Sequence, residues 1–418
     1  MSTKSFAVPK ALVWQAWQRV RANAGSPGVD RVTVAQYAAD EKNRLYKLWN
    51  RMASGSYFPS PVRRVEIPKG KDQIRPLGIP TVDDRIAQQV AKMVLEPILE
   101  PHFHCDSYGY RPGKSAIDAV AQARRRCWSY DWVVDVDIQG FFDTLDHARL
   151  LKAVRHHSKL PWIGLYIERW LTAPVQHPDG TLEARRQGTP QGGVISPLLA
   201  NLFLHYALDR WVEKTHPGIR FERYADDVVF HCRSRYEAEE LLEAVRQRLA
   251  ACSLVLHPAK TRIVYCRDSN RPEVGHAAIS FDFLGYTFRP RKAMNPKKQV
   301  FTGFTPAMSA KALRRIMAEV RKLKLQRRAG STVHDIAKWL NPKVRGWLAY
   351  FGHFGRHRLH RLIDWLDGVL VRWARGKFKR LTRSYRKSRR YLDRVREQQP
   401  ALFVHWQRGG RGWVRRAV

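Results

Sequence analysis

The sequence predicts an α+β protein: a mixed body over about the first 300 residues, followed by a strongly basic helical module. Helix-spaced and strand-spaced apolar patterns alternate in the body, whereas only helical spacing recurs after it. The charge changes at the same place, because residues 301–418 carry 30 Lys and Arg against 6 Asp and Glu. With 44% apolar and 11% aromatic residues, the 418-residue chain can bury a sizeable core.

The N-terminal part is predicted to start with a helix over Leu12–Val20, followed by a turn-rich stretch. Two short strands, Arg63–Pro68 and Ile74–Ile79, flank a turn over residues 69–72. A helix rich in apolar residues then begins at Thr81 and ends at Pro101.

The later part of the body reads as two strand regions around one helix. Trp132–Ile138 is predicted as a strand, Ser196–Trp211 as a helix, and Phe221–Cys232 as a β-hairpin. Phe281–Phe288 is a further β segment. Beyond it, apolar residues at helical spacing predict a small helical bundle whose other faces are basic.

Charge and cysteine content exclude several protein classes. A formal net charge of +38 attracts polyanions, which makes nucleic acid the expected partner. No apolar run is long enough for a membrane span or a signal core, so we expect a cytoplasmic protein with no membrane partner. The five cysteines are scattered without a CxxC pair, which argues against a disulfide scaffold and against zinc.

Two groups of carboxylates stand in separate β elements. In Val134–Ile138 apolar and acidic residues alternate, which places Asp135 and Asp137 on one strand face, about 7 Å apart. A half-exposed strand would show the same alternation without a function. Asp226 and Asp227 are adjacent at a predicted hairpin tip, where they repel each other unless a cation lies between them, and their oxygens suit Mg²⁺.

A second adjacent acidic pair serves as a contrast. Asp83 and Asp84 follow Thr81 at the start of a predicted helix, where Thr caps the helix and acids favour its N-terminus. A structural role is therefore expected for this pair. Asp226 and Asp227 have no such explanation, since a strand follows them.

Several segments resemble group II intron reverse transcriptases. Tyr224–Asp227 resembles the active-site box of reverse transcriptases, and Asp137–Asp143 resembles their first catalytic motif. Further boxes follow the family's order: Asn23–Thr33 (N-terminal extension), Arg75–Pro80 and Gly109–Gly113 (fingers), Gly188–Asn201 (PQG box), Phe283–Tyr286 (last palm block) and Leu340–Phe351 (maturase or thumb domain). The resemblance runs from about residue 12 to residue 375, and this series of boxes in the family's order is specific.

The resemblance implies a right-hand polymerase that acts as an RNA-directed DNA polymerase with two Mg²⁺ ions. Its expected domains are an N-terminal extension (1–60), fingers and palm (61–300), a helical maturase or thumb domain (301–375) and a basic tail (376–418). Some family members carry an endonuclease domain after the basic region, and none is expected here because the sequence ends at Val418.

The resemblance also assigns roles at the catalytic centre. Asp137 and Asp226 are expected to bind both metal ions, with Asp227 as the third carboxylate and the Ile138 carbonyl assisting. Asp135 and Asp143, also in these segments, are expected to be structural. The proposed metal-binding residues are therefore Asp137, Ile138, Asp226 and Asp227.

Five further residues are expected to contact nucleotide or template. Phe142 would lie against the sugar C2′ and exclude a 2′-hydroxyl, and Gln191 would lie beside the incoming nucleotide. Lys69 and Arg75 would grip the triphosphate, and Arg111 would meet a template phosphate. As alternatives, Phe142 is a core aromatic, and Lys69 and Arg111 are ordinary surface charges.

The tail from Lys377 to Tyr391 interleaves basic and aromatic residues, a pattern that suits phosphate contacts and base stacking. An unstructured solvated tail is the alternative. The basic residues expected to bind nucleic acid are Lys377, Lys379, Arg380, Arg383, Arg386 and Lys387.

The expected partners are group II intron RNA, an RNA template with a DNA primer, target DNA and deoxynucleoside triphosphates. The protein would act in a bacterial ribonucleoprotein, assist splicing, and serve retrohoming of a mobile element. Two alternatives remain: a domesticated or other retroelement reverse transcriptase without a splicing role, and a non-polymerising RNA-binding splicing factor. The intact aspartates Asp137, Asp226 and Asp227 argue against the second, because a pure binder needs no concentrated negative charge.

Overall fold

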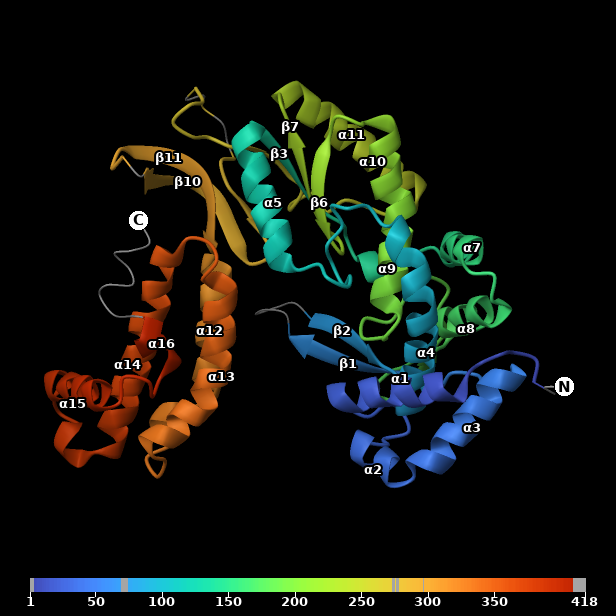
Figure 1. The fold of residues 1–418 in the computed structure, drawn as a ribbon, viewed down its shortest axis with the longest axis horizontal. Coiled ribbons are helices and arrows are strands. Elements are labelled where there is room, and N and C mark those ends of the chain that lie inside the picture. The colour runs from blue at the N-terminus through green and yellow to red at the C-terminus, as the bar shows by residue number, and fades with distance from the viewer. Residues whose placement is uncertain (1–3, 69–73, 273–274, 276–277, 296, 409–418) are drawn as a thin grey trace. The chain divides into compact units, whose positions relative to one another are not determined.

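A computed structural model describes residues 4–68, 74–272, 275, 278–295 and 297–408. The chain divides into two compact units (Figure 1). The first unit comprises Met1–Ser115, Val136–Val228 and Glu239–Thr261, and the second comprises Ala116–Asp135, Val229–Ala238 and Arg262–Val418.

The first unit is mainly helical and carries one four-stranded sheet of order β2-β1-β4-β5. Its helices are α1 (Lys10–Asn23), α2 (Val34–Ala39), α3 (Glu41–Ser54), α4 (Val82–Leu99), η1 (Glu100–His102), α6 (Phe141–Thr144), α7 (His147–His157), α8 (Pro161–Thr172), α9 (Ser196–Leu204), η2 (His205–Asp209), α10 (Arg210–Thr215) and most of α11 (Arg235–Ala251). The strands of its sheet are β1 (Val62–Pro68), β2 (Ile74–Ile79), β4 (Val175–Gln176) and β5 (Leu182–Glu183).

The second unit combines a three-stranded sheet of order β11-β10-β9 with helices from the C-terminal part of the chain. Its strands are β8 (Arg262–Tyr265), β9 (Phe281–Phe283), β10 (Tyr286–Met294) and β11 (Val300–Met308). Its helices are α5 (Ala116–Ser129), α12 (Ala310–Lys322), η3 (Leu325–Arg327), α13 (Val333–Phe351), η4 (Arg356–Leu359), α14 (His360–Lys377), η5 (Lys379–Leu381), α15 (Tyr385–Gln398) and α16 (Val404–Arg408).

A third sheet has the order β6-β7-β3-β8, with β3 (Trp132–Asp137), β6 (Arg220–Tyr224) and β7 (Asp227–Cys232). The boundary between the units cuts β3 and β7. β7 and β3 are neighbours in this sheet, and the end of β3 from Val136 and the start of β7 up to Val228 both belong to the first unit. The aspartates at these ends are the ones that the sequence singles out.

The acidic pair at the start of α4 anchors the N-terminal helices. The Thr81 hydroxyl accepts a hydrogen bond from the Asp84 N–H, which confirms the predicted N-cap. Asp83 accepts a hydrogen bond from the Tyr37 hydroxyl at 2.7 Å, and buried Asp84 accepts one from the Tyr57 hydroxyl. Both carboxylates therefore connect α4 to the segments around α2 and α3.

The secondary structure matches most of the predicted elements, with two differences in the C-terminal part. The β segment expected over Phe281–Phe288 is longer, because β10 continues to Met294 and pairs along its whole length with β11. The helical part therefore begins at Ala310, and the expected boundary at 375/376 falls inside α14. Within the described part of the chain, no helix is long and apolar enough to cross a membrane.

The buried carboxyl of Asp84 gives a pH-dependent prediction. Burial raises its pKa to about 6 from a usual 3.8, despite hydrogen bonds from Thr81 and Tyr57. Between these pH values the folded chain holds a proton that the unfolded chain has released, so stability falls as the pH rises through this window. The free energy of unfolding of Asp84→Asn minus that of the wild type should increase by about 1.4 kcal/mol from pH 5 to pH 7.5, because only the wild type loses stability in this window. The measurement is urea unfolding at both pH values. A difference that stays constant over this pH range would contradict the assignment.

Candidate active site

The acidic turn joins β6 to β7 and consists of Tyr224, Ala225, Asp226 and Asp227. Ala225 is buried and has a left-handed backbone conformation with φ of +56°, which is uncommon for a residue other than glycine. Asp226 is half-buried and Asp227 is exposed, and apolar residues of β7 follow them into the core. The turn therefore presents two carboxylates at the end of a buried strand.

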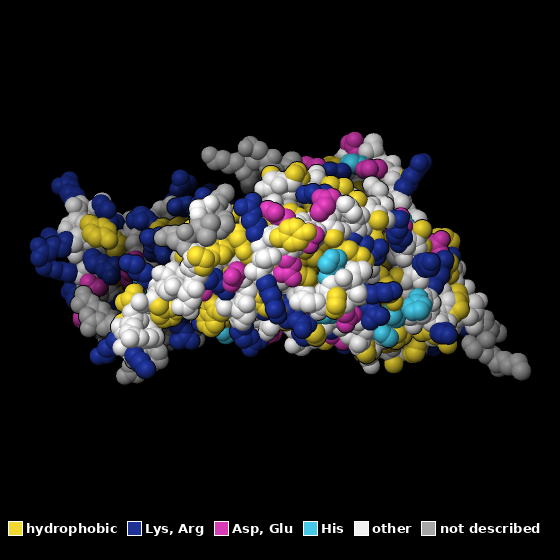
Figure 2. Space-filling model, turned by 90° about the horizontal axis from the view of Figure 1, so that it is seen from above, with side chains coloured by type: hydrophobic (Ala, Val, Ile, Leu, Met, Phe, Trp, Pro, Cys, Tyr) yellow, Lys and Arg dark blue, Asp and Glu magenta, His cyan; other side chains and the backbone are white. Residues whose placement is uncertain are grey.

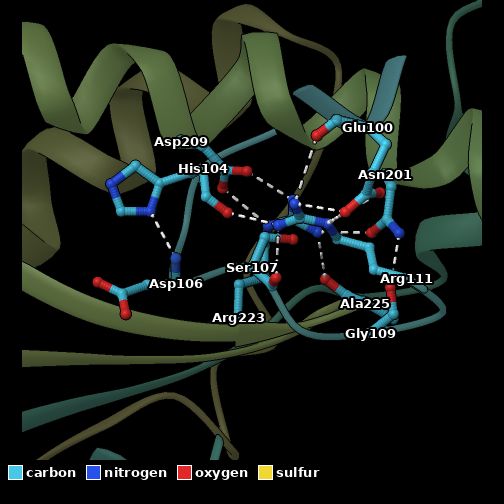
Figure 3. A network of polar contacts seen from close by, with 10 residues as sticks. All are labelled: Glu100, His104, Asp106, Ser107, Gly109, Arg111, Asn201, Asp209, Arg223 and Ala225. Atoms are coloured by element: carbon cyan, nitrogen blue, oxygen red, sulfur yellow. Dashed lines mark hydrogen bonds and ion pairs between the residues drawn. The ribbon is translucent and has the colours of Figure 1, made fainter. Parts of the chain in front are cut away.

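A buried arginine holds this turn in place (Figure 3). Arg223 is the residue before Tyr224, and its side chain is fully buried. Its guanidinium donates to both carboxylate oxygens of Asp209, at 2.7 and 2.5 Å, and to Asn201 Oδ1 at 2.9 Å. The same group donates to the carbonyl of Ala225 at 3.2 Å, which ties the strained residue of the turn to η2 and α9.

The segment 106–109 lies along the other side of Arg223. The Arg223 N–H donates to the Asp106 carbonyl at 3.0 Å, and the Tyr108 N–H donates to the Arg223 carbonyl at 2.8 Å. Asn201 donates to the Gly109 carbonyl at 2.7 Å. A Cβ added at Gly109 would lie 2.4 Å from the backbone nitrogen of Ala225, so only glycine fits beside the acidic turn.

Two neutral side chains lie close to this network. Burial lowers the pKa of His205 to about 4, so its ring is neutral at physiological pH and adds no charge beside Asp209. Burial, with a contribution from Tyr110, raises the pKa of Tyr224, so its hydroxyl stays protonated. The charged groups at the turn are therefore the carboxylates and the Arg223 guanidinium.

Asp137 is the last residue of β3, the strand next to β7 in the sheet. Its carbonyl accepts from the His257 N–H at 2.8 Å, and Ile138 forms an antiparallel bridge with Leu256. Its carboxylate meets the exposed ammonium of Lys260 at 3.0 Å. By contrast, Asp135 pairs with Arg262 at 3.2 Å, as a structural strand residue would.

The PQG segment joins two other predicted motifs through its backbone. The carbonyl of Gln191 accepts from the Gly78 N–H of β2 at 2.8 Å, and the Thr189 N–H donates to the Phe142 carbonyl at 2.7 Å. The Gln191 side chain donates to Asp143 at 3.2 Å. Gly78, Asp143, Thr189 and Gln191 line a cavity of about 680 Å³.

Residues 67–288 match the family model described as reverse transcriptase (RNA-dependent DNA polymerase), and they make up more than half of the chain. The chain belongs to the reverse transcriptase family. Residues 313–392 match the group II intron, maturase-specific domain. Both findings confirm the resemblance that the sequence motifs predicted.

Three relatives illustrate the similarity. Protein YkfC of Escherichia coli (strain K12) is 34% identical over 301 residues, which cover 63% of this chain and 76% of YkfC. Group II intron-encoded protein LtrA of Lactococcus lactis subsp. cremoris is 34% identical over 204 residues, 48% of this chain and 33% of LtrA. The putative COX1/OXI3 intron 1 protein of Saccharomyces cerevisiae is 31% identical over 203 residues, 47% of this chain and 24% of that protein. The match to LtrA thus spans about a third of LtrA's length.

The structure describes the side chains of only some of the residues that are expected to contact the nucleotide in this reverse transcriptase domain. Phe142 is half-buried beside Phe141, with ring centroids 5.4 Å apart, and Gln191 lies close to it through Thr189. Lys69 lies outside the described residues, and only the backbone of Arg75, in β2, is described.

Arg111 differs from its predicted role. Its side chain is only 6% exposed, and its guanidinium donates to the Glu100 carboxylate and to the carbonyls of His104 and Ser107. All three nitrogens are engaged inside the protein, so no donor is left for a template phosphate. Arg111 instead stabilises the segment that leads to Gly109 (Figure 3).

The described part of the basic tail, up to residue 408, is folded, which differs from the alternative of a solvated extension. Its exposed cations Arg386 and Lys387 lie in α15, and Lys379, Arg380 and Arg383 precede that helix. Lys377 is half-buried, because its ammonium donates to the carbonyls of Ala329 and Ser331, both at 2.9 Å. Lys and Arg side chains gather over the C-terminal helices on the face drawn in Figure 2.

Sequence reasoning missed the residues that position the acidic turn. Neither Arg223 nor Asp209 belongs to a recognised box, and they lie 14 positions apart in the chain. The available signal is an arginine immediately before the Tyr-Ala-Asp-Asp box, in a short strand that runs from Arg220 to Tyr224. Such a residue must find a buried acid or remain unpaired.

The donor set at the turn fits a hard divalent cation. Asp137, Asp226 and Asp227 supply only carboxylate oxygens, the ligands that Mg²⁺ prefers. Their oxygens do not form a cluster within 4.8 Å, since among the described residues only His104, Cys105 and Asp106 do. Those three are sequence neighbours, and the Nδ1 of His104 already accepts from the Asp106 N–H.

The close approach at Gly109 predicts a specific functional effect. In Gly109→Ala the new methyl group must displace the backbone of Ala225, so the carboxylates of the acidic turn shift. Primer extension should fall about 10²-fold while the protein stays folded, since displacements near 1 Å have effects of this size. The control is Gly218→Ala, because a Cβ at Gly218 meets no atom within 4 Å. Equal rates for both variants would refute the role of this close approach.

Proposed function

We propose that the chain is a Mg²⁺-dependent RNA-directed DNA polymerase that also binds group II intron RNA, assists its splicing and serves retrohoming. The observation that carries the polymerase function is the acidic turn before β7, which a buried Arg223 fixes and which leads into the strand next to the one that ends at Asp137. Burying a guanidinium costs free energy unless it is paired and hydrogen-bonded. The bonds that compensate Arg223 also hold the acidic turn in position.

Each residue of the site would have its own role in nucleotidyl transfer. Asp137 and Asp226 would hold two Mg²⁺ ions, with Asp227 and the Ile138 carbonyl completing the oxygen donors. When bound, the metal ions would supply charge stabilisation for the primer hydroxyl and the triphosphate. Lys260 would give up its contact with Asp137 when a cation takes its place, which its exposed position permits.

Nucleotide selection would rest on Phe142 and on residues of the PQG segment. Phe142 would stand against the sugar C2′ and exclude a 2′-hydroxyl, while Gln191, held by Gly78 and Asp143, would lie beside the incoming nucleotide. Lys69 and Arg75 would contact the triphosphate. The backbone bond between Gln191 and β2 supports this arrangement, because it joins the nucleotide-binding motifs directly.

The remaining parts would handle nucleic acid. We assign residues 1–60 to an N-terminal extension, 61–300 to fingers and palm, and the helices that follow to a thumb, in a right-hand polymerase. The maturase-specific match over 313–392 and the exposed cations of 379–387 support binding of intron RNA and target DNA. The expected setting is a cytoplasmic ribonucleoprotein.

The test of this function is primer extension on an RNA template, run beside a splicing assay with the RNA that flanks the reading frame. Extension that requires Mg²⁺ and deoxynucleoside triphosphates supports the polymerase. Faster splicing with the protein supports the maturase role. A chain that binds RNA but never extends a primer would instead be a splicing factor.

Asp226→Asn removes one charge and one strong oxygen ligand while keeping the side-chain size. We expect primer extension to fall by at least about 10³-fold, because the carboxylate stabilises several kcal/mol of developing charge through the metals. RNA binding should be unchanged. The matched control is Asp135→Asn on β3, whose carboxylate pairs with Arg262 and which should stay within about 10-fold of the wild type. Near wild-type extension by Asp226→Asn would refute the active site.

Phe142→Val should open space at the sugar C2′. Discrimination against ribonucleotides should drop by about 10-fold or more, since steric exclusion is the proposed filter. The measurement compares incorporation of matched ribo- and deoxynucleotides, with Phe141→Leu as a control because Phe141 is a buried core residue. Unchanged selectivity in an active Phe142→Val protein would remove this role.

Replacing the five exposed tail cations (Lys379, Arg380, Arg383, Arg386 and Lys387) with Gln should weaken RNA binding. The log–log salt dependence should become flatter by about 0.7 to 0.9 for every phosphate that is no longer neutralised. Extension of a short template at low salt should persist, while splicing assistance disappears. Lys377→Gln is the control, because its ammonium binds carbonyls within the protein and its removal should leave the salt slope unchanged. If the variant with all five substitutions binds RNA with the affinity and the salt dependence of the wild type, the proposed role of the tail is contradicted.

A further inference from the structure

A second cationic site lies entirely within the second unit, in a cavity of about 380 Å³. Helix α5, strands β10 and β11 and the loop after α13 surround it, and in Figure 1 α5 and β11 lie side by side. Its lining residues are Arg124, Ala293, Thr305, Pro306, His353, Phe354, Gly355, Arg356 and His357. No acidic residue is among them.

The loop is fixed on the hairpin by a glycine. Gly355 has a φ of +60°, and a Cβ added there would lie 2.4 Å from the Cβ of Ala307 in β11. The backbone of the loop therefore rests directly on the strand. The next residues, Arg356–Leu359, form η4 against β11, and the charge of Arg358 in η4 acts on Arg291 of β10.

Five arginines of the second unit, the arginine cluster, have no carboxylate partner among the described residues: Arg124, Arg289, Arg291, Arg358 and Arg361. Arg124 lines the cavity itself, and Arg291 binds the carbonyl of Thr305, which is another lining residue. Arg291 is buried, and it donates to the carbonyls of Thr287 and Thr305, which fix its position. The Nε of Arg358 is buried and has no hydrogen-bond partner. Like charges held together in this way favour an incoming anion.

The pKa values of the cluster report the same repulsion. Burial lowers the pKa of Arg291 to about 10, with Arg289 and Arg358 acting in the same direction. Burial, with Arg289 and Arg361, also lowers the pKa of Arg358. No carboxylate acts in the opposite direction on either group, so the positive charge is uncompensated by the described residues.

Aromatic rings lie beside these charges. The Arg124 guanidinium stands 4.5 Å from the ring centroid of Trp128 and 5.8 Å from that of Phe354. Trp128 is 48% exposed, and its indole N–H donates to the Phe304 carbonyl, which fixes the ring. A fixed ring next to phosphate-binding cations is the pattern on which single-stranded nucleic acids stack their bases.

We infer that the arginine cluster and this cavity form a binding site for the phosphodiester backbone of a single-stranded polynucleotide, whose bases stack on Trp128 and Phe354. The choice of a polynucleotide rests on the proposed function, whereas the anion site rests on the cluster itself. An acidic peptide would satisfy the charges and leave the rings unused. The site shares no residue with the basic tail or with the acidic turn.

The test uses the full chain and a fluorescein-labelled, unstructured RNA of about 20 nucleotides, with DNA of the same sequence in parallel. Binding is measured by anisotropy at several salt concentrations without nucleotides, so a failure of polymerisation does not affect it. The variant is Arg124→Gln with Arg358→Gln. The control is Arg155→Gln with Arg246→Gln, which removes the same net charge from arginines paired with Glu168 and Glu243.

For the cluster variant we expect the log–log salt slope for RNA to fall by about 1.4, and the affinity to fall about 25-fold near 0.1 M salt, because two phosphates are no longer neutralised. The control should match the wild type. An equal weakening for DNA would show that backbone phosphates alone are bound, and a weakening for RNA alone would show that the 2′-hydroxyl contributes; both support the site. A cluster variant that matches the control on both strands would overturn it.

A second double variant and a crosslinking experiment test the site even if the first double variant misfolds. Arg289 and Arg361 are both exposed, so Arg289→Gln with Arg361→Gln should fold and weaken binding to a similar extent. RNA that carries 4-thiouridine should crosslink, on irradiation, to peptides that contain Trp128 or Phe354. Crosslinks confined to other peptides would overturn the proposal.

Discussion

The buried ion pair between Arg223 and Asp209 is the interaction on which the candidate active site depends. Removing two charges from water costs several kcal/mol per ion, and only good geometry with further hydrogen bonds offsets this. Here both carboxylate oxygens are engaged, and Asn201 and the Ala225 carbonyl accept from the remaining guanidinium nitrogen. The pair thereby fixes a left-handed alanine, and with it the direction of two adjacent aspartates. A weaker support would let those like charges move apart.

The chain thus uses its charges in three different ways. In the first unit a fully paired arginine inside the core orients carboxylates that face outward. In the second unit several arginines have no carboxylate partner among the described residues, and one of them, Arg124, lies over the rings of Trp128 and Phe354. Exposed cations of α15 lie on the surface of the same unit. The buried ion pair fixes the positions of neighbouring residues, whereas positive charge without a carboxylate partner attracts phosphate groups. A reverse transcriptase needs both, because it must position metals and also retain a long polyanion.

Local patterns in the sequence predicted local features well. The hairpin around Asp226, the alternation around Asp137 and the helix cap at Thr81 depend on neighbours in the chain, and the structure has all three. The partners of Arg223 and Arg111 are set by packing between distant segments, which no periodicity records. The resemblance predicted a template phosphate as the partner of Arg111, yet Glu100 binds it. Family resemblance supplied the order of the boxes but not the contacts that hold them.

The most direct measurement is primer extension by a chain in which Arg223→Met and Asp209→Leu are combined. Replacing both members of a buried ion pair with apolar residues is often neutral or stabilising, so the free energy of unfolding should stay within about 2 kcal/mol of the wild type. The acidic turn would nevertheless lose its support, and extension should fall by at least about 10²-fold. A stable double variant that extends primers at the wild-type rate would contradict the claim that this pair positions the catalytic aspartates.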